Sequence, residues 1–385
     1  MRVCVVYDCL FPYTIGGAER WYRNLAERLA GEGHEVTYLT LRQWPRRERP
    51  TVGGVRVVAA APRMALYEAS GRRRIMPPLL FGLGVLAHLL RNPRRYEVVH
   101  TCAFPYFSLL AAAFVRPLGR YELVVDWFEV WSRSYWRGYL GRAGGRVGAL
   151  VQRLCARVSQ KAFCFSQMHA ERLRHEGLRG AVTVLRGLYA GPSEPHTPSQ
   201  ADDLVLFAGR LIPEKRVTLG VAAVARAARR IPGLRAEFLG DGPEREALRQ
   251  AIAEHGLQAT AAAPGFLSEA EVEDRMRRAA CLLLPSRREG YGMVVVEAAR
   301  WGTPSVVVAS EDNAAVELVE EGINGFVAQS ADPDAIADAI VQAHAGGVAL
   351  REATAAWFAR NAASLSLESS VETVLARYAE ASARP

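Results

Sequence analysis

The chain has 385 residues, which exceeds one ordinary compact domain and suits two domains of roughly 150–200 residues each. Half of the residues are hydrophobic and 23% are charged, a balance that excludes a disordered chain. No apolar run reaches the roughly 20 residues that a membrane-spanning helix requires, and residues 1–7 read as a strand instead of a signal peptide. Six scattered cysteines lack disulfide or zinc-site spacing, so we expect a protein of the reducing cytoplasm.

Basic side chains concentrate in the first half of the chain. Residues 1–200 carry 29 Lys or Arg and 14 Asp or Glu, a net charge of +15, whereas residues 201–385 carry 19 and 26, a net charge of −7. This asymmetry favours two domains with different partners. The basic half should attract an anionic partner such as a phosphorylated substrate, an acidic membrane surface or nucleic acid.

Short β-branched runs alternate with helical stretches along the whole chain. In the first half we expect a helix over 18–30 and strands over 3–7, 35–40, 55–59, 97–101 and 123–126. In the second half we expect helices over 217–230 and 244–255, and strands over 204–208, 236–239, 281–285 and 305–309. This alternation predicts two doubly wound α/β domains with parallel sheets, separated by the Gly-, Pro- and Ser-rich stretch 187–203. Such sheets bind ligands outside the carboxyl ends of their strands, so two facing domains predict an interdomain cleft.

The most informative motif runs from Pro285 to Ala299, where a strand enters a glycine loop and then a helix. The N–H groups that begin such a helix favour phosphate, and glycines permit close backbone approach. Glu289 in the loop suits sugar hydroxyls, and Glu297, about one turn inside the helix, suits ribose hydroxyls. The alternative is that both carboxylates are simply solvated.

Two further motifs follow strands. Arg210 offers a planar fork for phosphate and Lys215 a point charge, so together they suit a departing diphosphate. The alternative is an ordinary basic surface loop. Gly16 and Gly17 lie in a third strand-to-helix turn, either over a phosphate or merely in a turn. Because the three motifs come from both halves, an interdomain cleft would gather them around a nucleotide diphosphate.

Six short motifs, in order along the chain, resemble those of the retaining glycosyltransferases of family 4, which have the GT-B architecture of two facing Rossmann-like domains. They are Gly16–Glu19 with Gly33–Val36, Phe207–Lys215, Leu239–Glu244, Pro264–Leu267, the E-x7-E spacing Glu289–Glu297, and Gly302–Pro304 with Gly322–Phe326. The resemblance covers most of the chain. It implies an acceptor-binding domain over 1–190, completed by a terminal helix over about 367–385, and a donor-binding domain over 200–366.

The resemblance also implies roles for residues. Glu289, Arg210 and Lys215, with Asp126, are implied for catalysis. The residues implied for binding the nucleotide diphosphate sugar are Gly16, Gly17, Arg210, Lys215, Phe266, Leu267, Glu289, Gly290, Tyr291, Gly292, Met293, Val294 and Glu297. The donor's anomeric configuration is kept, with a donor phosphate oxygen assisting the acceptor hydroxyl. No nucleophile with an adjacent base is evident, which fits catalysis by positioning and charge stabilisation.

We expect no cofactor and no metal requirement. Asp332 and Asp334 form a D-x-D pattern, but no strand precedes it, and a cap for a helix over 335–344 explains it better. The eight histidines show no ligand spacing.

One departure from the family concerns donor choice. Many relatives carry a His-Asp pair where this chain has Phe128 and Glu129. We hypothesise that the donor sugar lacks, or differs at, the group that the histidine contacts, or that Asp126 replaces it. Trp127, Phe128 and Trp131 are the candidate acceptor-binding residues, because aromatic faces suit sugar rings. The alternative is a surface helix with tryptophans in the core.

The segment 72–95 is apolar with arginines at both ends. It predicts either a packed core helix or a peripheral contact with the inner membrane face that reaches a lipid-linked or anionic acceptor. Two rival functions remain: a GT-B sugar-nucleotide epimerase, which needs its own acid and base, and a non-enzymatic basic protein that binds membrane or nucleic acid. No nucleic-acid motif is present, so nucleic acid is not the expected partner.

Overall fold

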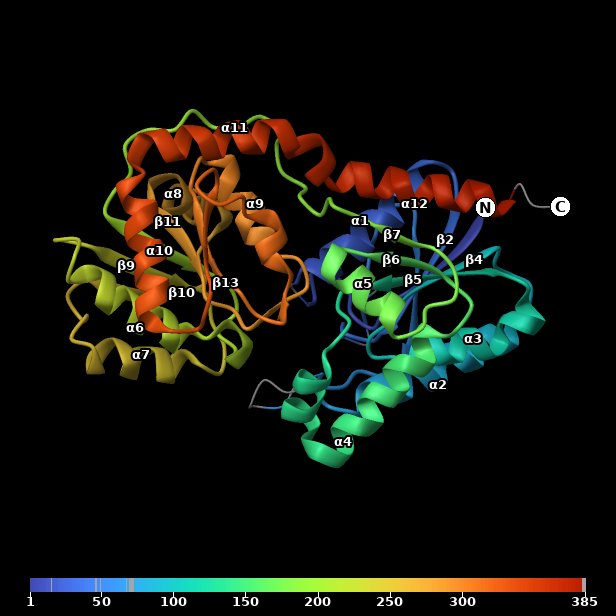
Figure 1. Cartoon of the computed structure of the whole chain (residues 1–385). Coiled ribbons are helices and arrows are strands. Elements are labelled where there is room, and N and C mark those ends of the chain that lie inside the picture. Colours follow the sequence, from blue (N-terminus) through green and yellow to red (C-terminus); the bar gives the residue numbers. More distant parts are fainter. Residues whose placement is uncertain (15, 46, 49, 67, 69–72, 383–385) are drawn as a thin grey trace. The chain divides into compact units, whose positions relative to one another are not determined.

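The computed structural model describes residues 1–382 except 15, 46, 49, 67 and 69–72. Arg72 of the predicted membrane segment and residues 383–385 of the predicted terminal helix therefore lie outside the described part. The chain forms two compact units (Figure 1). The amino-terminal unit contains the described residues up to 188 together with those from 367 onward, and the carboxyl-terminal unit spans Tyr189–Ser366.

The amino-terminal unit is built on a seven-stranded parallel sheet with the order β3-β2-β1-β4-β5-β6-β7. Its strands are β1 (Arg2–Val6), β2 (Glu35–Leu41), β3 (Arg56–Ala61), β4 (Val98–Cys102), β5 (Glu122–Trp127), β6 (Lys161–Cys164) and β7 (Val182–Val184). Its helices are α1 (Gly17–Gly31), α2 (Met76–Arg91), α3 (Phe107–Gly119), α4 (Arg133–Ala156), α5 (Gln167–His175) and α12 (Leu367–Ser382). Apart from the first residues of β1 and β5, the central strands β1, β4 and β5 are buried because helices cover both faces, which explains their mainly apolar sequences.

The carboxyl-terminal unit has a six-stranded parallel sheet with the order β10-β9-β8-β11-β13-β15 and a separate pair, β12-β14. The strands are β8 (Leu204–Ala208), β9 (Arg235–Leu239), β10 (Ala261–Gly265), β11 (Cys281–Leu284), β12 (Arg288–Glu289), β13 (Ser305–Val308), β14 (Asp312–Asn313) and β15 (Gly325–Ala328). The helices are α6 (Val217–Ala228), α7 (Arg245–Glu254), α8 (Glu269–Arg278), α9 (Met293–Arg300), α10 (Pro333–Ala345) and α11 (Gly347–Leu365), with 3₁₀ turns η1 (Pro213–Lys215) and η2 (Ala314–Leu318). Phe207, Phe238 and Val306 belong to the apolar core that holds this sheet against its helices.

Each sheet has one point at which the strand order reverses. In the amino-terminal unit the chain builds outward from β1 in one direction and from β4 in the other, and in the carboxyl-terminal unit the same happens at β8 and β11. The loops that follow two such strands diverge to opposite faces, which leaves a crevice at the carboxyl edge of the sheet. These two edges are where a doubly wound unit binds its ligands.

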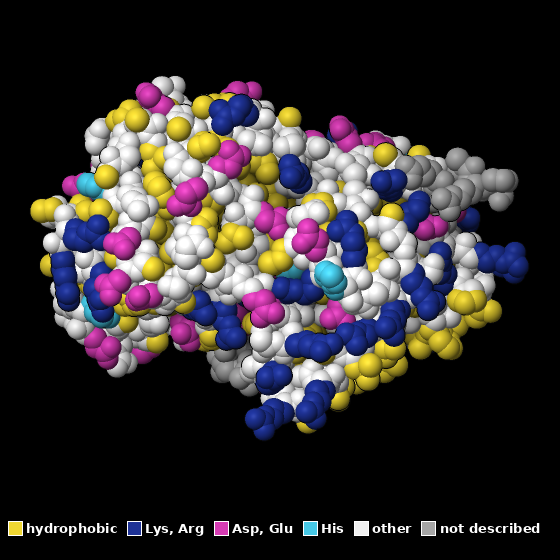
Figure 2. Space-filling model, in the orientation of Figure 1, with side chains coloured by type: hydrophobic (Ala, Val, Ile, Leu, Met, Phe, Trp, Pro, Cys, Tyr) yellow, Lys and Arg dark blue, Asp and Glu magenta, His cyan; other side chains and the backbone are white. Residues whose placement is uncertain are grey.

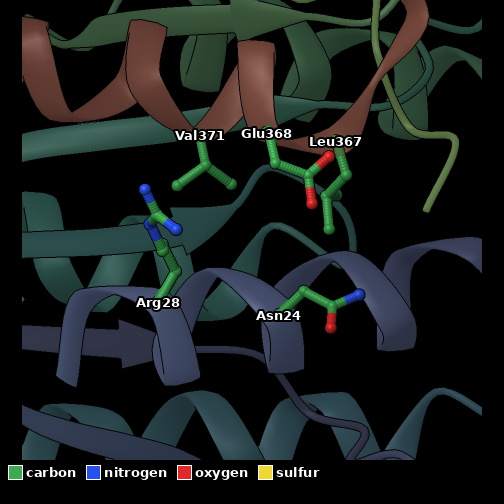
Figure 3. A pocket seen from close by; sticks show the side chains of 5 residues that line it. All are labelled: Asn24, Arg28, Leu367, Glu368 and Val371. Carbon is green, nitrogen blue, oxygen red and sulfur yellow. The ribbon is translucent and has the colours of Figure 1, made fainter. Parts of the chain in front are cut away.

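The terminal helix α12 packs on the amino-terminal unit. Ser370 Oγ accepts a hydrogen bond from Gly187 N at 3.0 Å, and Lys161 Nζ donates to the carbonyl of Arg377 at 2.6 Å. Near its end, the Tyr378 hydroxyl is hydrogen-bonded to His100 Nδ1 at 2.6 Å in the core. A pocket of about 230 Å³ lies where α12 begins beside α1, lined by Asn24, Arg28, Leu367, Glu368 and Val371 (Figure 3). None of the predicted site residues lines it.

Candidate active site

The loop after β8 is fixed by its neighbours at the carboxyl edge of the sheet. Gly209 N donates to the carbonyl of Leu239 at 3.0 Å, and Leu211 N donates to the carbonyl of Asp241 at 2.9 Å. Gly240 allows this approach, since a Cβ atom at its position would lie 1.9 Å from the Gly209 carbonyl oxygen. The loop then enters η1, which ends with Lys215.

The loop after β11 approaches from the other side of the reversal point. The short strand β12 pairs with β14, so that Glu289 stands opposite Asn313. The buried Asn313 amide donates to the carbonyls of Ser286 at 3.2 Å and Val308 at 2.8 Å. These bonds fix the backbone that carries Ser286 and Glu289.

Lys215 and Glu289 meet at this reversal point. The Lys215 ammonium forms an ion pair with Glu289 Oε1, and Ser286 Oγ donates to the same oxygen at 2.6 Å. Glu289 Oε2 has no hydrogen-bond partner in the described part of the chain. Only 17% of the lysine side chain and 11% of the glutamate side chain are exposed, so water screens the pair less than it would on an open surface. A fixed cation and a fixed carboxylate therefore stand together at the edge where ligands bind.

Further cations gather around this pair. Arg210 is exposed, and its side chain makes no hydrogen bond or ion pair with any described residue. Burial, and secondarily the charge of Arg287, lower the pKa of Arg216. Glu214 forms an ion pair with Arg288 at 3.7 Å, so its negative charge offsets only part of the positive charge of these side chains. Because the remaining cations repel one another, an anionic ligand would be stabilised here.

The start of α9 closes the same edge. Gly292 has a φ of 102°, and a Cβ atom there would lie 2.6 Å from Ala315 Cβ, so both the backbone conformation and the space require glycine. Gly290 is half-buried, Tyr291 is buried, and Met293 and Val294 form the first turn of α9. The N–H groups of a first turn lack partners within the helix and attract anions.

Two other predicted donor contacts also belong to the carboxyl-terminal unit. Glu297 is half-buried and is the fifth residue of α9. Phe266 follows β10 and its side chain is 75% exposed, while the adjacent Leu267 is half-buried. An exposed aromatic ring at the carboxyl end of a strand is a suitable platform for stacking a nucleotide base.

The predicted glycine turn of the amino-terminal unit has an acidic neighbour. Gly16 caps α1 and Gly17 is its first residue. A Cβ atom at Gly16 would lie 2.4 Å from Glu19 Oε2, and Glu19 is only 9% exposed. Gly16 thus makes room for a carboxylate over the start of α1, and that negative charge opposes a phosphate at the same place.

Asp126 and Trp127 lie in the core of the amino-terminal unit, and both are fully buried. Asp126 Oδ2 accepts a hydrogen bond from the Trp21 indole at 2.7 Å, and Oδ1 lies 2.8 Å from His100 Nε2. The Trp127 indole donates to Gln160 at 2.9 Å. Because helices cover both faces of β5, these side chains reach no surface. This burial favours a structural role in the core, and the catalytic role of Asp126 and the acceptor contact of Trp127 stay predictions.

The reversal point of the amino-terminal sheet holds residues that the sequence analysis missed. Asp8, fully buried just after β1, forms an ion pair with Arg73. The Arg73 guanidinium also lies 5.6 Å from the centre of the Phe104 ring, which follows β4. Phe104 in turn packs against Trp131 at a ring distance of 4.9 Å. Asp8 and Phe104 lie directly after β1 and β4, and this position was the sequence signal that could have identified them.

Phe128 contacts different rings, those of Tyr22 and Phe165. Its ring stacks on Phe165 at 4.3 Å with an interplanar angle of 5°, and it remains half-buried. Trp131 keeps 6% of its surface exposed and donates its indole hydrogen to Glu129 at 2.7 Å. Of the three predicted acceptor residues, Phe128 and Trp131 therefore retain accessible surface.

Comparison with known proteins identifies the family. A family model described as glycosyl transferases group 1 matches residues 193–356, and one described as glycosyltransferase family 4 matches residues 15–187. The chain belongs to glycosyltransferase family 4. This glycosyltransferase is 27% identical to a glycogen synthase of Mycobacterium tuberculosis over 361 residues, which cover 88% of this chain and 85% of the relative.

Solved structures show that this glycosyltransferase has the GT-B fold. HepE of Anabaena, solved with UDP, aligns with a TM-score of 0.74 at 18% identity, covering 99% of this chain and all of the other. Sucrose-phosphate synthase of Thermosynechococcus elongatus aligns with a TM-score of 0.77 at 17% identity, covering 98% of each chain. The predicted fold class and the predicted enzyme class are therefore confirmed.

Two further features of the glycosyltransferase concern metal binding and thiol chemistry. In the described residues, no three His, Cys, Asp or Glu side chains are grouped so that they could hold a metal ion. Asp332 caps α10 by accepting a hydrogen bond from Asp334 N at 3.1 Å, which confirms the helix-cap interpretation of the D-x-D pattern. All six cysteines are buried, and burial raises the pKa of each thiol. These thiols are therefore poor nucleophiles in the folded enzyme.

Proposed function

We propose that this enzyme transfers a sugar from a nucleotide diphosphate sugar to an acceptor hydroxyl with retention of configuration, and that the carboxyl-terminal unit binds the donor. The observation that carries the proposal is the Lys215–Glu289 ion pair, braced by Ser286 at the β8/β11 reversal point. A nucleotide diphosphate sugar carries an anionic diphosphate beside a neutral polyol. The site offers a cation and a carboxylate side by side, which matches that order of groups.

Each donor group has a partner in this proposal. Lys215 and the exposed Arg210 bind the diphosphate, together with the N–H groups at the start of α9. Glu289 Oε2 accepts hydrogen bonds from hydroxyls of the transferred sugar, while Oε1 stays bound to Ser286. Glu297 accepts bonds from the ribose, and Phe266 stacks on the base.

The bond between the anomeric carbon and the diphosphate breaks, and the acceptor oxygen bonds to that carbon on the same face. The acceptor's proton passes to the departing phosphate oxygen. Lys215 and Arg210 stabilise the negative charge that develops on this leaving group. Because side-chain cations supply this stabilisation, we propose that the reaction requires no metal ion and no cofactor.

A solved neighbour guides the choice of donor. HepE of Anabaena has been solved with UDP and also with UDP-glucose. We therefore take UDP and UDP-glucose as the first ligands to test. Phe128 stands where many relatives carry histidine. A panel of donors should therefore be tested to identify the sugar.

We propose that the amino-terminal unit binds the acceptor at the reversal point of its own sheet. There the partly exposed Arg73, paired with the buried Asp8, adjoins Phe104, and the ring of Trp131 packs against Phe104. Aromatic faces beside fixed charges suit a carbohydrate or cyclitol, whose C–H faces are apolar and whose hydroxyls are polar. The net charge of +15 on residues 1–200 favours an acceptor that is anionic or presented on an anionic lipid.

Lysine labelling tests the donor site directly, because Lys161 and Lys215 are the only lysines in the chain. They belong to different units, so Lys161 serves as an internal control. The protein is acetylated with and without UDP in EDTA, and modification of each lysine is read by peptide mass spectrometry. We expect UDP to protect Lys215 several-fold and to leave Lys161 unchanged.

Calorimetry with UDP, GDP, ADP and dTDP in EDTA completes the test. One nucleotide should bind more tightly than the others, and it should be the one that protects Lys215. Equal labelling of Lys215 with every nucleotide, together with no measurable binding, would overturn the assigned donor site.

A further inference from the structure

Exposed apolar side chains are concentrated on one part of the amino-terminal unit. Among the described residues, 11 of the 14 exposed large hydrophobic side chains lie between residues 75 and 154. Most belong to α2, α3 and α4, which gather on one side of the sheet in Figure 1. Figure 2 shows hydrophobic side chains along the same lower right edge, next to Lys and Arg side chains. We call the exposed side of these three helices the α2–α4 face.

The outer side of α3 is almost entirely apolar. Leu110, Phe114 and Leu118 are 37%, 71% and 58% exposed. Their spacing of four residues places them on one side of the helix. On the neighbouring α2, Leu83 and Leu90 are 52% and 44% exposed. The other side of α2 packs inward, because Phe81, Val85 and Leu89 are buried. That side agrees with the interpretation of this segment as a packed core helix.

α4 adds an apolar stripe with a row of arginines beside it. A kink at Gly141, whose φ is 74°, starts the second part of this helix. In that part Val147, Leu150 and Leu154 are 61%, 57% and 52% exposed and share one side. Arg146 and Arg153 directly precede Val147 and Leu154, and Arg142 lies one turn before Arg146, so these three arginines border the stripe along the helix. This part of α4 is therefore amphipathic: Gly148, Gln152 and Cys155 on one side are buried, while the stripe and its border face outward.

The charge of the α2–α4 face selects its partner. The three helices contain seven arginines and no Asp or Glu. A second copy of the chain would bring the same positive charges together across a symmetric contact, which disfavours a dimer through this face. An anionic lipid surface complements both features, since acyl chains accept the leucines and phenylalanine while phosphate headgroups pair with arginines. None of the helices in the described part of the chain has the length and apolar composition to cross a bilayer, so the contact would be peripheral.

We propose that the α2–α4 face docks this enzyme on an anionic lipid bilayer. Phe114 and Leu150 enter the headgroup boundary, and Arg142 and Arg146, which border the α4 stripe, pair with lipid phosphates. The proposal rests on exposure and charge in the amino-terminal unit alone and holds whether or not the donor assignment is correct.

Vesicle sedimentation tests it. The full chain is mixed with vesicles of phosphatidylglycerol and phosphatidylcholine in equal parts, or of phosphatidylcholine alone. We expect binding to the anionic vesicles that weakens as salt is raised, and at least tenfold weaker binding to the neutral ones. Arg142→Gln with Arg146→Gln should weaken anionic binding by about tenfold or more. Arg249→Gln with Arg360→Gln, two exposed arginines of the other unit, is the matched control and should change nothing.

The apolar part is tested by Phe114→Ser with Leu150→Ser, which should also weaken binding by about tenfold or more. Ile323→Ser, at an exposed apolar position of the other unit, is its control. An environment-sensitive dye on Val147→Cys gives an independent measurement, because the six natural cysteines are buried. Its emission should shift to shorter wavelength on anionic vesicles, whereas the same dye on Ile323→Cys should not respond.

Four results would overturn the proposal: no binding to anionic vesicles, equal binding to neutral ones, equal effects of the test and control variants, or an unchanged Val147 dye. Light scattering tests the rival occupant of this face, a second copy of the chain. If the chain is a dimer that Phe114→Ser with Leu150→Ser dissociates, and it does not bind vesicles, the face belongs to a second copy.

Discussion

The ammonium of Lys215 is ion-paired with the carboxylate of Glu289, although 74 residues of sequence separate them. They meet because β8 and β11 are adjacent at the point where the sheet reverses its strand order. Lysine is rare here, since only two of the 48 basic side chains are lysines. The chain therefore places a compact lysine ammonium beside Glu289, although arginine supplies nearly all of its other basic side chains.

Neutralising either member of this pair should reduce sugar transfer while the fold survives. For Lys215→Met and Glu289→Gln we expect kcat/KM to fall by about 10²–10³, because each removes charge that we place against the leaving group or the sugar. The measurement is steady-state transfer with the donor identified by calorimetry. Lys161→Met is the control, and equal losses in this variant would show that lysine replacement alone explains the effect.

Gly292→Ala should damage the start of α9. The substitution forces a side chain into a backbone with φ of 102° and brings Cβ within 2.6 Å of Ala315 Cβ. We expect a loss of roughly 1–3 kcal/mol in the free energy of unfolding and weaker nucleotide binding. Urea denaturation and calorimetry measure the two effects.

Gly256→Ala is the matched control for this prediction. Its φ is 69°, but a Cβ atom there meets nothing within 4 Å. It should lower stability through backbone strain alone and leave nucleotide affinity unchanged. Similar losses of affinity in both variants would disconnect the start of α9 from the nucleotide.

Asp126→Ala distinguishes a core role from a catalytic one. The substitution leaves the buried Trp21 indole and His100 imidazole without their carboxylate. We therefore expect the free energy of unfolding to fall by about 2–4 kcal/mol. Nucleotide binding by the other unit should persist at temperatures where the variant is folded. Tyr378→Phe, which removes the other partner of His100, should cost about 1 kcal/mol. Full stability with lost turnover in Asp126→Ala would instead restore the catalytic interpretation.

Alkaline pH should destabilise the enzyme through its buried thiols. Burial raises the pKa of the Cys281 thiol from its ordinary value of 9.0 to about 12. Above pH 9 the unfolded chain loses this proton while the folded chain keeps it, so stability falls as pH rises. One such thiol accounts for about 1.4 kcal/mol between about pH 8 and about pH 10.

The measurement is urea denaturation with reductant at these two pH values, for the wild type and Cys281→Ala. Between these pH values, the free energy of unfolding of the carboxyl-terminal unit should fall by about 1.4 kcal/mol less in Cys281→Ala than in the wild type. Cys155→Ala carries the same type of change, since burial raises the pKa of that thiol to about 12, but in the amino-terminal unit. A pH dependence that neither variant alters would remove the thiols as its cause.

The sequence by itself determined most of the elements and predicted the candidate donor motifs. Buried parallel strands such as β1 and β11 are mostly apolar runs, and the loop after β11 contains glycines, so their signals are local. The same reasoning missed β10, whose sequence AAAPG carries no β-branched residue and is a strand because it pairs with β9. Lys215 and Glu289 were also predicted, because each belongs to a short motif with a fixed place after a strand.

Only the tertiary structure decided which polar side chains are buried and which apolar ones are exposed. Asp126 and Phe114 both contradict the expectation from residue type, since the carboxylate is in the core and 71% of the phenylalanine is on the surface. Asp8 and Arg73 come together through a fold contact between distant segments. Burial depends on which elements cover a side chain, and that packing involves residues far apart in sequence, so no local pattern encodes it.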